Sequence, residues 1–270
     1  MNEAAARRFE LQAGAGQTDW PVLICLLGPF QLLKAGRPVP LRSGGKIEAL
    51  LSTLALQPGY GVRREELLAG LWPDQDVLLA GQSLNSLVYS VHRLLGEALD
   101  APPVLLADGL YRLNVEAGIG IDIACFDALV SAGERAAHAG DRRHAVESFA
   151  RAVEFYRGDL RVGSDVRAAI ERERLRARFL TVLAQLADWA FACRDYAACL
   201  DHALRLLQCD PCREDAHRLV MRCYVRRGER AQALRQYHLC CSILHDEFDA
   251  EPEQRTTALF DQIRLAPETV

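Results

Sequence analysis

The chain has 270 residues, half of them hydrophobic and a quarter charged, with a formal net charge of −4 at pH 7. This length suits two ordinary domains, and no apolar run approaches the roughly 18 residues that a membrane-spanning helix needs. The first 20 residues lack the apolar segment of a secretion signal, so we expect a cytoplasmic protein, not bound to membranes, with a disordered tail over residues 1–20.

The nine cysteines are more than a chain of this length usually carries. Cys209 and Cys212 have the C-x-x-C spacing that suits zinc or a redox pair, but the chain has no second pair with this spacing. Reduced, buried thiols are the usual state of cytosolic cysteines. We therefore predict structural thiols and no metal site, with a metal or redox pair as the alternative.

Short apolar runs at residues 22–27 and 30–33 predict two strands, and a third is expected at 39–41. Together they predict a small antiparallel sheet. Ser43 is then the expected N-cap of a helix that continues to about Leu56, because the apolar residues that follow share one helical face. A second, shorter helix is expected over residues 63–71.

Residues 81–96 predict the most informative helix. Its apolar residues form one stripe that includes Leu84, Val91 and Leu95. A groove-reading helix needs amides for adenine edges, arginine for guanine or phosphate, and small hydroxyls for either. The alternative is a solvated face on an ordinary amphipathic helix. The side chains on the face opposite the apolar stripe are Gln82, Asn85, Ser86, Tyr89 and Arg93.

A hairpin signal follows this helix. Asp108-Gly109 lies between two apolar runs, at residues 104–107 and 110–113, which is typical of a type I′ turn. A short helix, a turn, a longer helix and a hairpin follow one another in this order in a winged helix-turn-helix. We therefore predict a DNA-binding domain of this kind over residues 21–115, with Arg112 on the wing, where it would meet the DNA.

Three segments carry a family resemblance: LLGPFQLLKAGRPVPLRSGGKIEALLSTLALQPGYGVRREELLAGLWPDQ, SLNSLVYSVHRLL and DGLYRLNV. They resemble the SARP-type bacterial transcriptional activators, which carry a response-regulator-type winged helix and a bacterial transcriptional activator domain. The resemblance extends from about residue 22 to the end of the chain. Where that family has a pair of arginines late in its recognition helix, this chain has His92 and Arg93, and the resemblance places both among the expected DNA-binding residues. In that family the helical domain contributes to dimerisation and activation, so the resemblance implies a homodimer.

The resemblance also implies a contact with RNA polymerase. We expect the loop over residues 72–80 to make it, because nine residues are more than a plain helix-turn-helix needs between its two helices. Asp74 and Asp76 are the residues of this loop that we expect to contact the polymerase.

Residues 116–270 predict helices only, after a short connector. Similar sequences that predict the start of a helix begin at Asp141, Asp195 and Glu229, each after the end of a preceding helix. Leu200 and Leu234 are 34 residues apart, which is the period of a tetratricopeptide repeat. Stacked helix pairs form a superhelix whose concave surface binds a protein or a small-molecule effector. The predicted fold is therefore mainly α: a winged helix with small sheets, then a TPR-like helical domain.

A long charged helix is expected over residues 164–193. Its arginines alternate with glutamates, and they either line an anion pocket or form ion pairs on a solvated helix. We favour the ion pairs. The arginines in question are Arg172, Arg174, Arg176 and Arg178.

Neither half of the chain is basic, which is the main argument against DNA binding. Residues 1–115 hold 10 Lys and Arg against 11 Asp and Glu. Binding would then depend on a small positive stripe among neutral neighbours. The basic side chains that this stripe needs are Arg42, Lys46, Arg63, Arg64, Arg93 and Arg112.

No catalytic motif accompanies these features. The chain lacks a P-loop, a dinucleotide-binding glycine motif, a serine-hydrolase elbow and a zinc-protease motif. We therefore expect no enzyme and no cofactor. The predicted function is a transcriptional regulator that binds double-stranded promoter DNA. The alternative is an adaptor that does not bind DNA, in which both domains serve protein–protein interaction.

Overall fold

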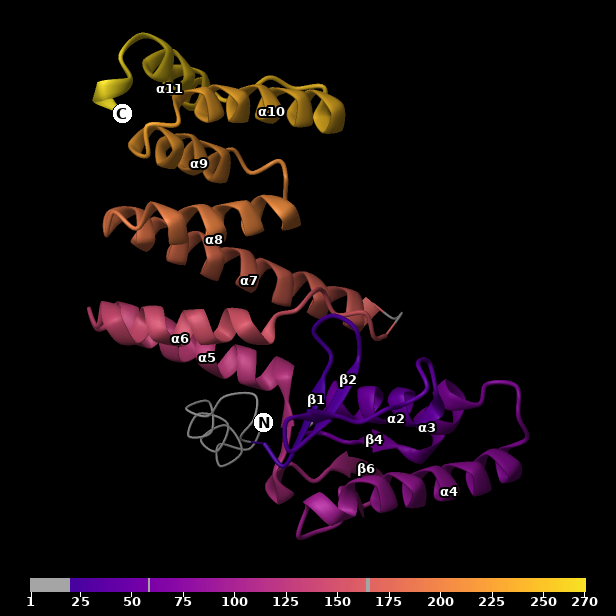
Figure 1. The fold of residues 1–270 in the computed structure, drawn as a ribbon. Helices are drawn as coiled ribbons and strands as arrows, with labels where there is room; N and C mark the ends of the chain where they lie inside the picture. Colours follow the sequence, from indigo (N-terminus) through magenta and orange to yellow (C-terminus); the bar gives the residue numbers. More distant parts are fainter. Residues whose placement is uncertain (1–19, 58, 164–165) are drawn as a thin grey trace. The chain divides into compact units, whose positions relative to one another are not determined.

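The structure of the chain, a computed structural model, describes residues 20–57, 59–163 and 166–270. By their internal contacts they form two compact units, the first ending at Arg176 and the second running from Ala177 to Val270. The expected tail lies outside the described residues up to position 19. Trp20, its expected last residue, is instead buried. The fold class predicted from the sequence, mainly α with small N-terminal sheets, is confirmed (Figure 1).

A four-stranded sheet in the order β3-β2-β1-β7 forms the start of the first unit. The all-antiparallel sheet expected from the sequence is wrong, because β1 pairs antiparallel with β2 but parallel with β7. β7 lies where a connector was expected, and β3 lies before the expected third strand. The strands are β1 (Val22–Cys25), β2 (Gln31–Lys34), β3 (Arg37–Pro38) and β7 (Ile119–Ile121).

Three helices follow this sheet: α2 (Lys46–Ala55), α3 (Arg64–Leu71) and α4 (Val77–Leu95). Ser43 is not the N-cap of α2, since Gly45 occupies that position and makes no side-chain bond. Gly44 turns the chain there with a φ of +68°, a conformation that favours glycine. Its N–H donates to Glu48 Oε2 at 2.8 Å, so a glutamate of the first turn accepts a backbone N–H that lies just before the helix.

A second sheet, in the order β4-β6-β5, contains the predicted hairpin. Asp108 and Gly109 connect its strands with φ of 53° and 75°, the paired positive values of a type I′ turn, so this prediction is confirmed. Pairing of β4 with β6 ties the hairpin to the start of α3. The strands are β4 (Val62–Arg63), β5 (Val104–Ala107) and β6 (Leu110–Leu113).

A buried carboxylate joins the first sheet to the helices that follow. Asp122 is 1 % exposed, and its Oδ2 accepts the backbone N–H groups of Leu26 and Leu27 at 2.8 Å each. It begins α5 (Asp122–His138), which packs against α6 (Arg142–Phe155) and against β1 and β7. Figure 1 shows α5 and α6 side by side.

The expected helical openings at Asp141, Asp195 and Glu229 are confirmed, because each residue directly precedes a helix. Asp141 and Asp195 act as N-caps by accepting the backbone N–H three residues later. Glu229 makes no such side-chain bond. The remaining helices are α7 (Val166–Ala192), α8 (Tyr196–Cys209), α9 (Glu214–Arg226), α10 (Arg230–Phe248) and α11 (Gln254–Leu265).

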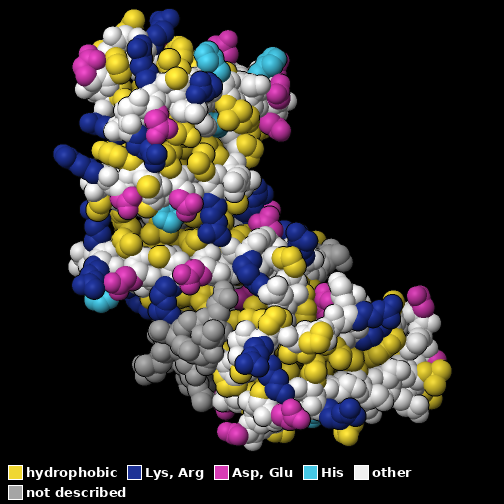
Figure 2. Space-filling view, viewed as in Figure 1, with side chains coloured by type: hydrophobic (Ala, Val, Ile, Leu, Met, Phe, Trp, Pro, Cys, Tyr) yellow, Lys and Arg dark blue, Asp and Glu magenta, His cyan; other side chains and the backbone are white. Residues whose placement is uncertain are grey.

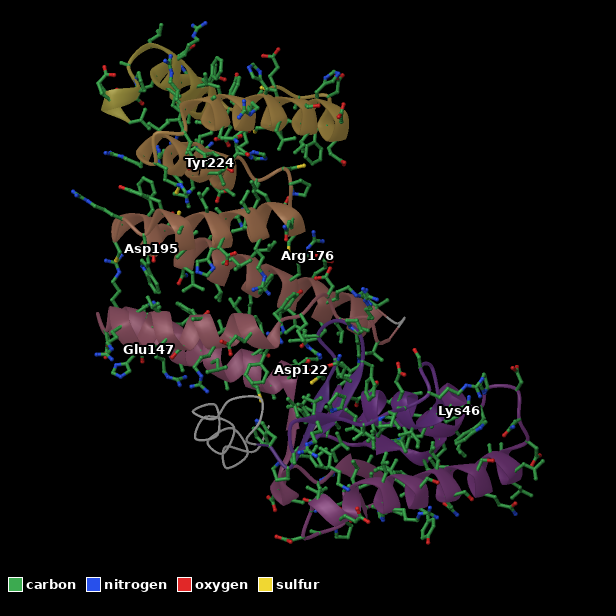
Figure 3. All side chains as sticks on the ribbon, viewed as in Figure 1. Lys46, Asp122, Glu147, Arg176, Asp195 and Tyr224 are labelled. Carbon is green, nitrogen blue, oxygen red and sulfur yellow. The ribbon has the colours of Figure 1, made fainter. Side chains whose placement is uncertain are left out.

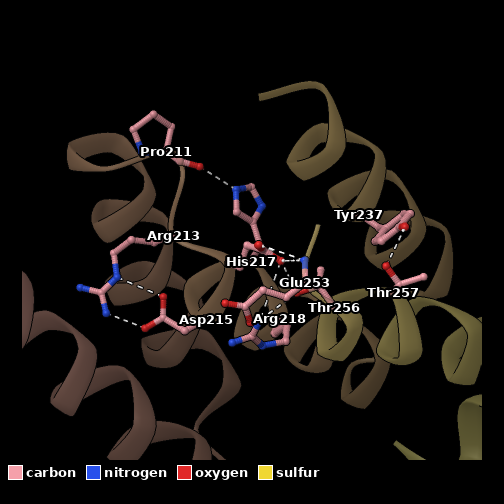
Figure 4. Close-up of polar contacts among 10 residues, drawn as sticks. Pro211, Arg213, Asp215, His217, Arg218, Tyr237, Glu253, Thr256 and Thr257 are labelled. Carbon is pink, nitrogen blue, oxygen red and sulfur yellow. Dashed lines mark hydrogen bonds and ion pairs between the residues drawn. The ribbon is translucent and has the colours of Figure 1, made fainter. Parts of the chain in front are cut away.

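Hydrogen bonds fix the helices of the second unit on one another (Figure 4). Gln236 Nε2 lies 2.7 Å from His217 Nδ1, and His217 Nε2 lies 2.9 Å from the Pro211 carbonyl. Because the carbonyl only accepts, Nε2 carries the ring proton and Nδ1 accepts. Burial lowers the pKa of His217, which favours this neutral ring. Arg218 adds a link from α9 to α11 by donating to Thr256 Oγ1 at 2.8 Å.

Candidate nucleic-acid interface

The second helix of the helix-turn-helix, α4, has one buried stripe and one exposed polar face. Leu84, Val91 and Leu95 are completely buried, as their spacing predicted. Tyr89 on the other face is 66 % exposed. The complete set of expected base-reading residues is exposed, namely Gln82, Asn85, Ser86, Tyr89 and Arg93.

The hydroxyl groups of two serines on this face donate hydrogen bonds to backbone carbonyls of the same helix. Ser86 Oγ donates to the Gln82 carbonyl at 3.1 Å, and Ser90 Oγ donates to the Ser86 carbonyl at 2.8 Å. Each hydroxyl therefore presents lone pairs, and not a proton, to a partner outside the helix. Ser90 is not among the residues predicted to read bases, although its spacing of four residues from Ser86 places it on the same face.

Two cations of the expected positive stripe donate hydrogen bonds to other elements of the first unit. Lys46, labelled in Figure 3, donates to the Leu71 carbonyl and lies 5.6 Å from the centre of the Trp72 ring. Arg64 donates to Tyr111 Oη at 2.8 Å and to the Gly81 carbonyl at 3.0 Å. Both side chains thus connect elements of the first unit.

His92 also has a partner within the fold. Its Nε2 lies 3.1 Å from the Val104 carbonyl, so it joins α4 to the first strand of the hairpin. A neutral imidazole can donate this bond, since one of its two nitrogens carries a proton. The contact gives a structural reason for a histidine at a position where the resembling family has arginine.

The remaining basic residues are better placed for an external partner. Arg42, Arg63 and Arg93 are exposed, and Arg112 is partly exposed on β6. The stem of Arg112 crosses Gly61, where a Cβ would lie 2.6 Å from Arg112 Cγ. Figure 2 shows Lys and Arg side chains dispersed among uncharged ones on the visible face of the first unit.

The loop expected over residues 72–80 is shorter in the structure, because α4 begins at Val77. Asp76 is the N-cap of this helix and accepts the Leu78 N–H at 2.9 Å. Asp74 lies in the remaining turn and is exposed. The first turn of α4 is apolar yet exposed, with exposed fractions of 71 % for Val77 and 79 % for Leu78. Neither residue is among those predicted from the sequence to contact a partner.

Two further questions from the sequence lie outside this interface: whether the cysteines form a metal or redox site, and whether the arginines of the long charged helix form ion pairs or an anion pocket. All nine cysteines are free, and Cys209 and Cys212 are partly exposed. Among the described residues, no group of three or more His, Cys, Asp and Glu side chains has a metal-binding arrangement. Arg174 forms ion pairs with Asp127 and Glu171, at 2.6 and 2.7 Å, which matches the favoured ion-paired helix.

The helices can also be compared with what a membrane-spanning segment requires. In the part of the chain that the structure describes, every helix is too short or too polar to cross a bilayer.

Comparison with known families decides what the helical region is. The family model described as "Bacterial transcriptional activator domain" matches residues 121–264, more than half of the chain. The chain belongs to this family. The match begins at β7, so it includes α5, α6 and the helices of the second unit.

Relatives extend the likeness to the N-terminal region. The regulatory protein AfsR of Streptomyces coelicolor is 28 % identical over 89 % of this chain, and DnrI of Streptomyces peucetius is 28 % identical over 86 %. The transcriptional regulatory protein MoaR1 of Mycobacterium tuberculosis is 27 % identical over 88 %. The alignments cover 24 % of AfsR, 78 % of MoaR1 and 88 % of DnrI, so the chain spans only about a quarter of AfsR.

A solved structure shows the same fold. Mycobacterium tuberculosis EmbR, determined in complex with a low affinity phosphopeptide, aligns over 91 % of this chain and 65 % of its own. The TM-score is 0.68 at 25 % sequence identity. The resemblance to SARP-type activators that the sequence indicated is thereby confirmed.

Proposed function

We propose that the chain is a DNA-binding transcriptional regulator, and an activator, that inserts α4 into the major groove of promoter DNA. The observation that carries this proposal is the exposed polar face of α4, opposite a completely buried stripe and beside a hairpin wing. Amides, hydroxyls and an arginine on this face are the donors and acceptors that reading base edges requires. The regulatory names of its relatives support the same function.

The free charges predict how DNA binding depends on salt. Lys46, Arg64 and His92 are engaged within the fold, so we assign phosphate contacts to four arginines. Four contacts predict a slope of about −3.6 for log affinity against log salt concentration, compared with about −10 for a highly charged repressor. Base contacts then supply a large share of the affinity. The four arginines are Arg42, Arg63, Arg93 and Arg112.

Selection from a random duplex pool at two salt concentrations tests the DNA-binding function. We expect one enriched motif at both concentrations, because the contacts to base edges persist when phosphate contacts weaken. Asn85→Ala should weaken binding to this motif and relax one position of it. If no motif is enriched at either concentration, the adaptor function becomes the better account of the fold.

RNA polymerase is the proposed partner of the turn before α4. Asp74 and the exposed apolar residues Val77 and Leu78 together offer a surface outside the groove-reading face. Asp76 is the N-cap of α4, so the proposed contact rests on Asp74 and these apolar residues. The double substitution Asp74→Ala with Leu78→Ala should leave DNA affinity unchanged and reduce transcription in vitro. Unchanged transcription from an occupied promoter would contradict this assignment.

We propose the same two functional regions that the sequence predicts. Residues 21–115 bind DNA, and residues 116–270 form a TPR-like domain that dimerises or receives a protein or small-molecule effector. The proposed activity is regulatory and not enzymatic. It requires promoter DNA, which in bacteria lies in the cytoplasm.

A further inference from the structure

An arginine of the preceding helix holds the side chain of Asn85 on the exposed face of α4. Arg64 Nη1 lies 3.1 Å from Asn85 Oδ1. A guanidinium has donors only, so the amide atom that faces it must be the oxygen. The hydrogen-bonding chemistry of the pair therefore decides which end of the Asn85 amide is the oxygen and which is the nitrogen, a choice that the shape of the side chain leaves open. Oδ1 faces Arg64, and Nδ2 with its two protons is left for another partner.

Arg64 itself has little freedom to move. Its Nη1 also donates to Tyr111 Oη at 2.8 Å, and its Nη2 donates to the Gly81 carbonyl at 3.0 Å. Gly81 makes room for this guanidinium, because a Cβ at that position would lie 2.9 Å from Arg64 Nη2. Three bonds to α4 and β6 fix the arginine, so the orientation of the Asn85 amide is set before any DNA arrives.

We infer that Asn85 recognises a base whose major-groove edge carries acceptors and no donor, guanine or thymine, and that Arg64 is the positioning residue that imposes this choice. The inference rests on the proposed DNA-binding function. A free asparagine pairs with adenine by donating to N7 and accepting from the N6 amino group at the same time. Here Arg64 already donates to that oxygen, so the N6 amino group of adenine, itself a donor, would have to share it with the guanidinium. Two donors remain, and they match guanine N7 and O6 or thymine O4.

Exchanging the exposed donor for an acceptor tests this inference directly. Asn85→Asp keeps one oxygen toward Arg64 and puts a second oxygen where Nδ2 was. Random duplex pools are selected in parallel with the full-length wild type, with Asn85→Ala and with Asn85→Asp. The position at which Asn85→Ala loses preference identifies the contacted base pair. We expect guanine or thymine there for the wild type, and bases with a donor, cytosine or adenine, for Asn85→Asp.

Releasing the amide provides a second, independent test. Arg64→Met removes the donors and keeps an unbranched apolar stem, so Asn85 Oδ1 loses its partner on Arg64 and adenine should gain at the same position. Tyr111→Phe is the matched control, because it removes another bond of Arg64 and leaves the bond to Asn85. We expect its base preference to equal that of the wild type.

The outcomes separate this inference from the proposed function. Adenine preference by the wild type, or an unchanged preference in Asn85→Asp, overturns the inference while leaving DNA binding intact. Failure of the wild type to enrich any sequence overturns the DNA-binding function, and the inference with it. A change from guanine or thymine to cytosine or adenine, at one position only, supports both.

Discussion

At the scale of single residues, Asp122 has the most unusual environment of the described carboxylates that initiate a helix. It is almost completely buried, and three backbone N–H groups donate to it, those of Leu26, Leu27 and Ile123. Arg157 forms an ion pair with it, with Nη2 4.0 Å from Oδ2. Burial disfavours the charged form, and it outweighs the hydrogen bonds and the arginine, raising the pKa of Asp122 to about 6.

This carboxyl should make the stability of the first unit depend on pH. Its folded pKa of about 6 lies above the ordinary value near 4, so between these values the folded state binds more protons than the unfolded state. The free energy of unfolding should therefore fall as pH rises from 4 to 6, by about 3 kcal/mol, and then level off. Urea denaturation at several pH values measures this.

Asp122→Asn is the control that isolates this one group, because other acids titrate in the same range. The amide removes the titration, and it puts N–H donors against backbone donors at a cost of about 1–3 kcal/mol. The stability difference between wild type and variant should shrink as pH rises through 6. A difference that grows with pH would mean that the hydrogen bonds, and not burial, set the pKa.

At the scale of secondary-structure elements, the N-terminus of α4 depends on a single side chain. Asp76 Oδ1 accepts from the N–H of Leu78 at 2.9 Å and of Leu79 at 3.4 Å. The apolar residues of this first turn are exposed and contribute little burial. The cap and its charge at the positive end of the helix therefore stabilise this turn.

A pair of aspartates two residues apart tests the cap. Asp76→Ala should lower the free energy of unfolding by about 1 kcal/mol, since two backbone donors lose their acceptor. Asp74→Ala removes the same charge from the same exposed turn, but Asp76 and not Asp74 is the N-cap, so this variant should change stability by less than about 0.5 kcal/mol. Urea unfolding of both variants measures the difference. Equal losses would show that charge, and not the hydrogen bond, matters here.

Patterns confined to one element could be predicted from the sequence, while pairings between distant segments could not. The stripe of α4 and the Asp108-Gly109 turn each depend on residues close in the chain. β7 is three residues long, and its partner β1 lies about 97 residues earlier. Such a segment is too short to show a hydrophobic periodicity that would predict a strand. The engagement of Lys46 and Arg64 within the fold could not be predicted either, because their acceptors lie on other elements.

At the scale of the whole chain, the winged helix shares its compact unit with the start of the activator domain. Leu160, beyond the end of α6, bridges to Leu27 and Gly28, at the end of the first strand. Arg174 in α7 pairs with Asp127 in α5 at 2.6 Å. The unit accordingly continues to Arg176, although the family match begins at residue 121. A winged helix cut off before α5 therefore loses contacts on which its own sheet depends.

Truncation at two points tests this dependence and the proposed dimer together. A chain that ends at Arg176 keeps the buried side chains of α5 and α6, including Phe126 and Phe149, and should fold with a cooperative urea transition. A chain that ends at Ile123 loses both helices and exposes the sheet face under α5, so it should be markedly less stable. Circular dichroism and urea denaturation compare the two.

The chain ending at Arg176 then isolates the contribution of the helical repeats to DNA binding. If these repeats join two protomers, the second contact becomes intramolecular and raises affinity without new contacts. Affinity for two half-sites one helical turn apart should fall at least tenfold on truncation, while affinity for one half-site should change little. Both are titrated at one fixed salt concentration, because the electrostatic contribution varies steeply with salt. Equal affinity of the truncated and full chains for the double site would contradict the dimer and leave the repeats as a surface for an effector or partner protein.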